Sequence, residues 1–145
     1  MIRVQREDFD VGREIAALVG LVRDMQGDAR DGAARGTRVG AMTLEHYPGM
    51  TEKKLAEIEA EANARWPLEA SLVIHRYGRL EPGDRIVLVA CASPHRDAAF
   101  DACRFLIDWL KTEAPFWKLE ETDEAEQWVE ARDSDEIRKK RWLAD

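Results

Sequence analysis

The chain has 145 residues, of which 45% are hydrophobic and 35% charged, and its formal net charge at pH 7 is −7. This composition is typical of one folded domain with its own core and excludes a largely disordered chain. The negative charge argues against general nucleic-acid binding. Because the sequence has neither an 18-residue apolar run nor a signal-peptide pattern, we expect a cytoplasmic protein without a membrane span.

The first quarter of the chain alternates short apolar segments with a glycine-rich stretch. Residues 2–5 predict a short strand, and residues 10–18 predict a helix whose first residue, an aspartate, caps it. Residues 18–25 are apolar enough to predict a buried strand that ends in Arg23. Residues 26–36 contain three glycines and no large apolar side chain, which predicts a loop.

The next segments predict a strand and a helix. Residues 37–47 alternate in the way that a half-buried strand does. Thr51 is placed to cap a helix that Pro67 stops. The buried face of this helix would be formed by Leu55, Ile58, Ala62 and Trp66.

The middle of the chain predicts a hairpin. Residues 71–77 and 85–92 are strand-like, and the turn-forming sequence Glu-Pro-Gly-Asp at 81–84 lies between them. The second strand is almost continuously apolar, so we expect it at the centre of a sheet. Cys91 and Cys103 have no cysteine or histidine at metal-ligand spacing, so we expect two buried, reduced thiols and no metal site.

A long helix is predicted over about 94–113. Ser93 as its cap and Pro94 at its first position form a favoured start, and Pro115 ends it. The buried stripe of this helix would be formed by Ala99, Ala102, Cys103, Leu106 and Leu110.

The remaining segments complete the predicted fold. Residues 116–121 and 128–131 predict strands, and residues 133–142 predict a charged final helix. Strands and helices are interleaved along the chain. The fold class is therefore α+β, with residues 1–145 forming a single domain in which a mixed or antiparallel sheet with hairpins packs against two or three helices.

The two ends of the long helix carry candidate ligand-binding residues. His95 and Arg96 lie in its first turn, where free N–H groups and the positive end of the helix dipole attract anions, although many helices begin with polar residues and bind nothing. Lys111 lies at the other end, roughly 24 Å away at ~1.5 Å per residue. A small ligand that used both ends would need a second subunit, which predicts an oligomer.

Lys111 and Lys118 lie on either side of Pro115 and two aromatic residues. A turn at the proline would bring the lysines together, and one of two neighbouring ammonium groups gives up its proton more readily. One lysine could then act as a nucleophile or a general base. The structural alternative is that Lys111 complements the helix dipole and Lys118 occupies the polar position of a strand.

Other polar residues give weaker signals. Arg23 beside the glycine-rich loop could bind a phosphate or carboxylate, or could be a surface arginine at a strand end. His46 and His75 lie in strand patterns and are interpreted as structural. The basic run at 138–141 is either a solvated helix face or the border of an anion site. Because the sequence has no P-loop, GxGxxG, Ser-His-Asp order or zinc-ligand spacing, we expect no cofactor.

Several short motifs occur together, in order and at matching spacing. They are TLEHYPGM (43–50), RWPL (65–68), PGD (82–84), HR (95–96), DWLKTEAPFWK (108–118) and WVEA (128–131). Over about residues 37–142 the sequence resembles the catalytic large subunit of molybdopterin synthase, the MoaE family.

The resemblance implies a reaction and partners. Family members add two sulfurs to cyclic pyranopterin monophosphate and so form the dithiolene of molybdopterin, in molybdenum cofactor biosynthesis. Each sulfur arrives as a thiocarboxylate on the C-terminal Gly-Gly of a small ubiquitin-like subunit, and a homodimer of large subunits with two small subunits forms a heterotetramer. By motif match, Lys118 and Lys111 would be the catalytic lysines, and Arg23, His95 and Arg96 would bind the substrate.

One departure from the family pattern concerns the N-terminal region. Family members usually carry a further stretch, with most of an apolar strand, before the segment that matches residues 20–23, so residues 1–36 are shortened. Either the first helix serves as a strand or the sheet loses an element. An alternative function is therefore a non-catalytic dimeric module that binds a phosphorylated ligand or a partner's C-terminal tail.

Overall fold

A computed structural model describes residues 1–10, 18–21, 39–122, 125–129 and 133–143. Its strands are β1 (Ile2–Gln5), β2 (Leu18–Leu21), β3 (Val39–His46), β4 (Ala70–Arg76), β5 (Gly78–Leu80), β6 (Arg85–Ala92), β7 (Phe116–Thr122) and β8 (Glu126–Val129). The helices are α2 (Met50–Arg65), α3 (Arg96–Thr112) and α4 (Asp133–Lys140). The strands form two four-stranded sheets, with the orders β1-β4-β6-β2 and β5-β3-β7-β8.

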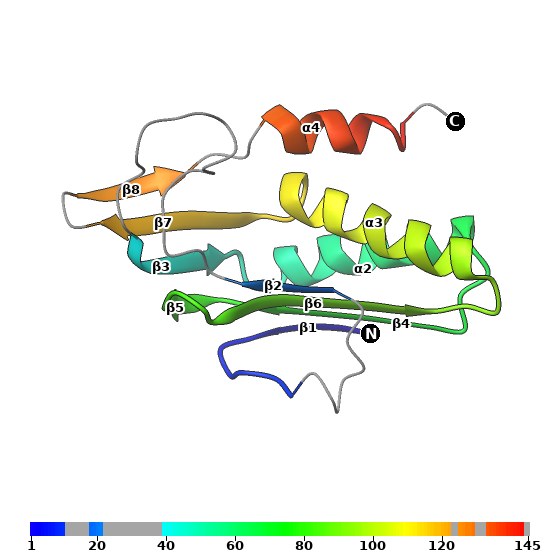
Figure 1. Cartoon of the computed structure of the whole chain (residues 1–145), viewed down its shortest axis with the longest axis horizontal. Coiled ribbons are helices and arrows are strands. Elements are labelled where there is room, and N and C mark those ends of the chain that lie inside the picture. Colours follow the sequence, from blue (N-terminus) through cyan, green and yellow to red (C-terminus); the bar gives the residue numbers. More distant parts are fainter. Residues whose placement is uncertain (11–17, 22–38, 123–124, 130–132, 144–145) are drawn as a thin grey trace.

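The first sheet carries the helices, and the second extends from the end of α3. In the first sheet β1 is parallel to β4, whereas β4 with β6 and β6 with β2 are antiparallel. In Figure 1, α2 and α3 lie over one face of this sheet, and α4 lies on the side of α3 that faces away from it. The second sheet is antiparallel throughout.

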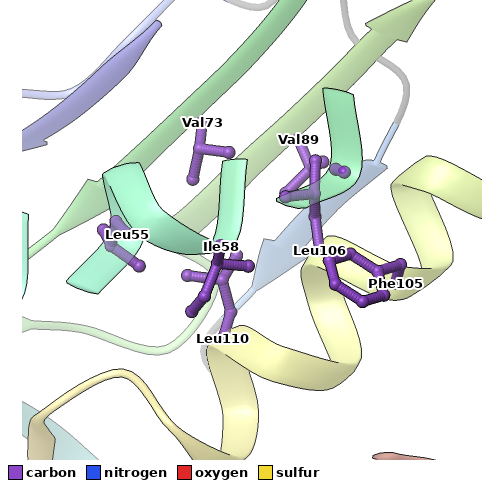
Figure 2. Packing of buried hydrophobic residues seen from close by; sticks show 8 residues of the cluster. Leu55, Ile58, Val73, Val89, Phe105, Leu106 and Leu110 are labelled. Atoms are coloured by element: carbon purple, nitrogen blue, oxygen red, sulfur yellow. The ribbon is translucent and has the colours of Figure 1, made fainter. Parts of the chain in front are cut away.

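The main core fills the space between α2, α3 and the first sheet. The side chains labelled in Figure 2 are Leu55 and Ile58 of α2, Val73 of β4, Val89 of β6, and Phe105, Leu106 and Leu110 of α3. A second cluster contains Phe9, Ile74 and Leu88. Because side chains alternate between the two faces of a strand, Ile74 and Leu88 lie on the face opposite to the one that the helices cover.

The predicted α+β class is confirmed, and most predicted elements lie within a few residues of the observed ones. At the predicted turn, the N–H of Asp84 donates to the carbonyl of Glu81 at 3.0 Å, and Gly83 has a φ of 91°. The prediction of a single hairpin around this turn is wrong in one respect. Strand β5 lies between β4 and β6 in the chain and pairs with β3 of the other sheet, so the chain visits the second sheet before it returns.

The predicted cap of α2 is wrong. The helix begins at Met50 with Gly49 as its cap, and the N–H of Gly49 donates to the Glu52 carboxylate at 2.7 Å. Gly49 has a φ of 82°, which glycine adopts without strain. Thr51 instead lies inside the first turn and is fully buried, and its hydroxyl does not cap the helix.

The predicted cap of α3 is also wrong by two positions. The helix begins at Arg96 with His95 as its cap, so it covers slightly less than the predicted 94–113. The hydroxyl of Ser93 donates to the carbonyl of Pro67 at 2.8 Å and accepts the N–H of His95 at 3.2 Å. Ser93 therefore connects the segment before α3 to the end of α2 rather than capping α3.

Several predictions concern residues outside the described ones. The helix predicted over 10–18 falls mainly on residues 11–17, Leu18 begins strand β2, and the loop predicted over 26–36 lies wholly outside. Cys91 and Cys103 are free thiols as predicted, but they are half-buried rather than fully buried. The pKa of Cys91 is raised mainly by its hydrogen bond with Cys103 and, to a smaller extent, by burial. No helix in the described ranges is both long and apolar enough to cross a membrane.

Candidate active site at the end of helix α3

Helix α3 and strand β7 meet at Pro115, and α2 fixes their junction. The Thr51 hydroxyl donates to the Pro115 carbonyl at 3.2 Å and accepts the N–H of Tyr47 at 3.0 Å. Because Thr51 is 0% exposed, water does not compete for these hydrogen bonds. Lys111 in the last turn of α3 and Lys118 in β7 are therefore attached to backbone that the first turn of α2 holds in place.

A group of rings supports the start of β7. Phe116 stacks on His75 with 3.8 Å between ring centroids, and His46 lies 4.2 Å from Tyr77 and 6.4 Å from Phe116. His75 Nδ1 donates to the carbonyl of Arg76 at 2.9 Å, since a carbonyl can only accept. Burial lowers the pKa of His75 to about 4, which the hydrogen bond to Arg76 opposes and the neighbouring His46 reinforces. His75 is therefore neutral near pH 7 and has the structural role that the sequence predicted.

This burial predicts an acid-sensitive fold. Because the folded-state pKa of His75, about 4, lies below the ordinary value of 6.5, the unfolded chain binds more protons between these two pH values. The free energy of unfolding is highest above pH 6.5 and falls, by about 3 kcal/mol in all, as the pH drops from 6.5 through about 4. Urea unfolding between pH 4 and 7 should therefore give a smaller pH slope for His75→Phe than for the wild-type protein. Equal slopes would refute this assignment.

Lys118 pairs with a buried carboxylate on its own strand. Its Nζ lies 2.6 Å from Oε1 of Glu120, and the two side chains are 26% and 7% exposed. Leu44 of β3 and Val129 of β8 are the register neighbours of Lys118. An amine that is partly shielded from water is a candidate nucleophile or general base.

Lys111 has a looser partner on another element. Its Nζ lies 3.8 Å from Oδ1 of Asp135 in α4, and its side chain is 52% exposed. The same carboxylate oxygen lies 3.6 Å from Arg138. The pair is long and its ammonium group is half-exposed, so Lys111 can exchange Asp135 for another anion, while Arg138 remains beside the Asp135 carboxylate. Each of the two lysines therefore has a carboxylate partner of its own.

The basic run at 138–141 docks α4 on α3. Lys139 pairs with Glu113, the residue that caps the C-terminal end of α3, and this hydrogen bond raises the pKa of Lys139. Just beyond the same, C-terminal end of α4, Trp142 Nε1 donates to the buried carboxylate of Asp108 at 2.8 Å. The run is therefore not a simple solvated face, because its contacts hold the helix that presents Asp135 to Lys111.

Of the three residues predicted to bind the substrate, the two that the structure describes lie away from the junction. Arg23 is outside the described residues. His95 and Arg96 are exposed at the start of α3, where Arg96 Nε lies 3.8 Å from a carboxylate oxygen of Asp97. At ~1.5 Å per residue the helix separates His95 from Lys111 by roughly 24 Å, so one chain does not bring these residues together.

Three residues of the junction were missed by the sequence analysis. Glu120 had a signal, because it follows Lys118 by two positions and strand periodicity places both on one face. Asp135 and Thr51 had none, since their roles depend on how α4 and α2 pack against α3. Within the described part of the chain, no three His, Cys, Asp or Glu side chains are grouped so that they could hold a metal ion.

Comparisons with known proteins extend over nearly the whole chain. The family described as MoaE protein matches residues 4–113. The chain is 55% identical to the molybdopterin synthase catalytic subunit of Pseudomonas aeruginosa over an alignment 147 positions long that covers 97% of each protein. It is 45% identical to the solved molybdopterin biosynthesis MoaE protein from Burkholderia ambifaria MC40-6, with a TM-score of 0.79 and coverage of 99% of this chain and 98% of that one.

A more distant structure shares the fold alone. It comes from the protein-protein complex of subunits 1 and 2 of molybdopterin-converting factor from Helicobacter pylori 26695, with a TM-score of 0.65 at 14% identity, covering 90% of this chain and 91% of that one. Fold and junction together define an α+β domain whose candidate chemistry rests on two lysine amines. The extent and identity of the matches then settle the family. The chain belongs to the MoaE family, as its motifs predicted.

Proposed function

We propose that this chain is the catalytic subunit of a molybdopterin synthase and acts as a sulfurtransferase in molybdenum cofactor biosynthesis. The reaction adds two sulfurs to cyclic pyranopterin monophosphate and forms the dithiolene of molybdopterin. The close relatives that carry the name molybdopterin synthase catalytic subunit support this assignment. The observation that carries it is the α3–β7 junction, where two lysine amines of different exposure are attached to fixed backbone.

The two lysines have different roles in the proposed reaction. Lys118 is the less exposed amine. Either its nitrogen bonds to the carbonyl carbon of the sulfur donor's C-terminus as the C–S bond there breaks and the sulfur stays with the pterin, or it acts as a general base. Lys111 is half-exposed and only loosely paired with Asp135, which suits it to orient and neutralise an anionic substrate. A phosphate or thiocarboxylate that displaces Asp135 accepts a charge-assisted hydrogen bond from the ammonium group of Lys111.

The sulfur donor is a small ubiquitin-like subunit with a C-terminal Gly-Gly. The Helicobacter pylori chain of the same fold, which comes from a complex of two different subunits, supports a protein partner of this kind. Arg23, His95 and Arg96 bind the pterin phosphate. Because α3 separates His95 and Arg96 from Lys111, two copies of this chain form a homodimer in which one copy supplies the helix start and the other the lysines. With two small subunits the assembly is a cytoplasmic heterotetramer that involves neither nucleic acid nor membrane.

Reconstitution tests the proposed function. Purified protein, thiocarboxylated small subunit and cyclic pyranopterin monophosphate are mixed, and the dithiolene product is measured. We expect product that depends on all three components. If the folded protein binds the small subunit but yields no product, the sulfurtransferase role is wrong and a non-catalytic binding module is the better description.

Substitution of Lys111 should weaken the handling of substrate more than the chemical step. We expect Lys111→Ala to lower kcat/KM about tenfold, mainly through a higher KM for the pterin phosphate, since one charge-assisted contact contributes about 1.5–3 kcal/mol. Steady-state rates at low and saturating pterin phosphate measure this. A rate at low substrate equal to that of the wild-type protein would exclude the role given to Lys111.

A further inference from the structure

Glu120 carries a carboxylate that is only half satisfied. Its Oε1 forms an ion pair with Lys118 Nζ at 2.6 Å, and its side chain is 7% exposed. Its Oε2 is buried and has no hydrogen-bond partner among the described residues. The register neighbours on both sides are Met42 of β3 and Gln127 of β8, and neither carries a charge. A buried carboxylate oxygen without a donor destabilises the fold, so its presence needs a reason other than stability.

The contrast with the next residue shows that this arrangement belongs to one face of β7. Glu121 points to the opposite face, where Arg79 of β5 lies 3.4 Å from its Oε2, and its side chain is 33% exposed. Glu121 therefore has the ordinary environment of a surface carboxylate. Glu120 has the unfavourable one, and among the described residues its ion-pair partner is Lys118.

We propose that Glu120 is the positioning residue for Lys118. Its buried carboxylate fixes the Nζ atom at the place where the amine meets the substrate, and the burial of this carboxylate lowers the stability of the fold. This inference rests on the proposed function, since it assigns Lys118 a reactive role. Backbone restraints place only the Cα of Lys118, and its long side chain has many rotamers. A short ion pair with a carboxylate that itself cannot move into solvent restricts this freedom.

Loss of Glu120 should leave the stability of the fold unchanged or raise it, which is unusual for a member of a buried ion pair. Removing one partner of a buried ion pair normally destabilises a protein, because the other charge is left buried and unpaired. Here the remaining partner is Lys118, which is 26% exposed and can turn its ammonium group into water. Loss of Glu120 then removes an unsatisfied buried oxygen and strands no charge. A residue kept for stability would show the opposite sign.

The test compares substitutions at two neighbouring positions. Glu120→Met keeps an unbranched side chain of similar length and removes both oxygens, and Glu121→Met is the matched control. For Glu120→Met we expect an unchanged or higher Tm and a kcat about ten to a hundredfold lower in the reconstituted synthase, because a displacement of about 1 Å at a reacting group can cost about a hundredfold. The KM for the small subunit should stay within about twofold of the wild-type value. Glu121→Met should keep the wild-type kcat.

A conservative variant separates positioning from packing. Glu120→Gln retains a neutral oxygen that can accept from Lys118, so its kcat should lie between those of the wild-type protein and Glu120→Met. A lower Tm with wild-type kcat in Glu120→Met would show a structural ion pair and overturn the proposal. Absence of product from the wild-type protein would instead overturn the proposed function, whereas wild-type kcat in Glu120→Met alongside an inactive Lys118→Ala overturns only the role of Glu120.

Discussion

Replacement of Lys118 by alanine is expected to abolish turnover and leave the fold intact. The substitution removes the less exposed of the two amines, whose Nζ lies 2.6 Å from Glu120, and with it the nucleophile or base of the proposed reaction. Groups with these roles contribute about a hundredfold or more to the rate, so we expect at least that loss in kcat. Single-turnover assays with thiocarboxylated small subunit and cyclic pyranopterin monophosphate measure it.

The stability of this variant should fall along with its activity. Removal of Lys118 leaves the 7% exposed Glu120 carboxylate without its ion-pair partner, and loss of one partner of a buried pair costs about 3–5 kcal/mol, so circular dichroism must first show that the variant is folded at the assay temperature. Lys53→Ala is the matched control, because Lys53 is an exposed lysine in the first turn of α2. It should keep the wild-type rate. Full activity of Lys118→Ala would refute the role assigned to Lys118.

The order and type of the elements were predictable because each has a strong local pattern. The apolar spacing of α2 and α3 and the Glu81–Asp84 turn depend on neighbours in the sequence, and the structure contains all three. The caps were less predictable, since a cap requires a particular backbone conformation as well as a suitable side chain. Thr51 is a good capping residue, yet the cap of the helix is a glycine two positions earlier, which adopts a φ of 82°.

The environment of the lysines was predictable only in part. Motif matching located Lys111 and Lys118, and strand periodicity could have added Glu120. The ion pair between Lys111 and Asp135 depends on the docking of α4, which joins residues far apart in the chain. No local pattern encodes that docking. It rests on long-range contacts such as the hydrogen bond between Trp142 and Asp108.

The docking of α4 also explains why the core should be most sensitive at one aromatic residue. Phe105 is 0% exposed, and its ring centroid lies 5.4 Å from that of Trp66 and 5.6 Å from that of Trp142. The ring thus joins α3 both to the end of α2 and to Trp142, two residues beyond the end of α4. Loss of this ring leaves a cavity beneath Trp142 and weakens the attachment of the helix that carries Asp135.

We therefore expect Phe105→Ala to lower the free energy of unfolding by about 3–5 kcal/mol, measured by urea denaturation at pH 7. The matched control is Phe100→Ala on the same helix, where the ring is 69% exposed and the change should stay within about 0.5 kcal/mol. Because both substitutions alter helix propensity equally, the difference between their effects on the free energy of unfolding isolates the contribution of the buried ring. A difference below about 1 kcal/mol would show that Phe105 does not join α2, α3 and the C-terminal segment as its ring contacts indicate.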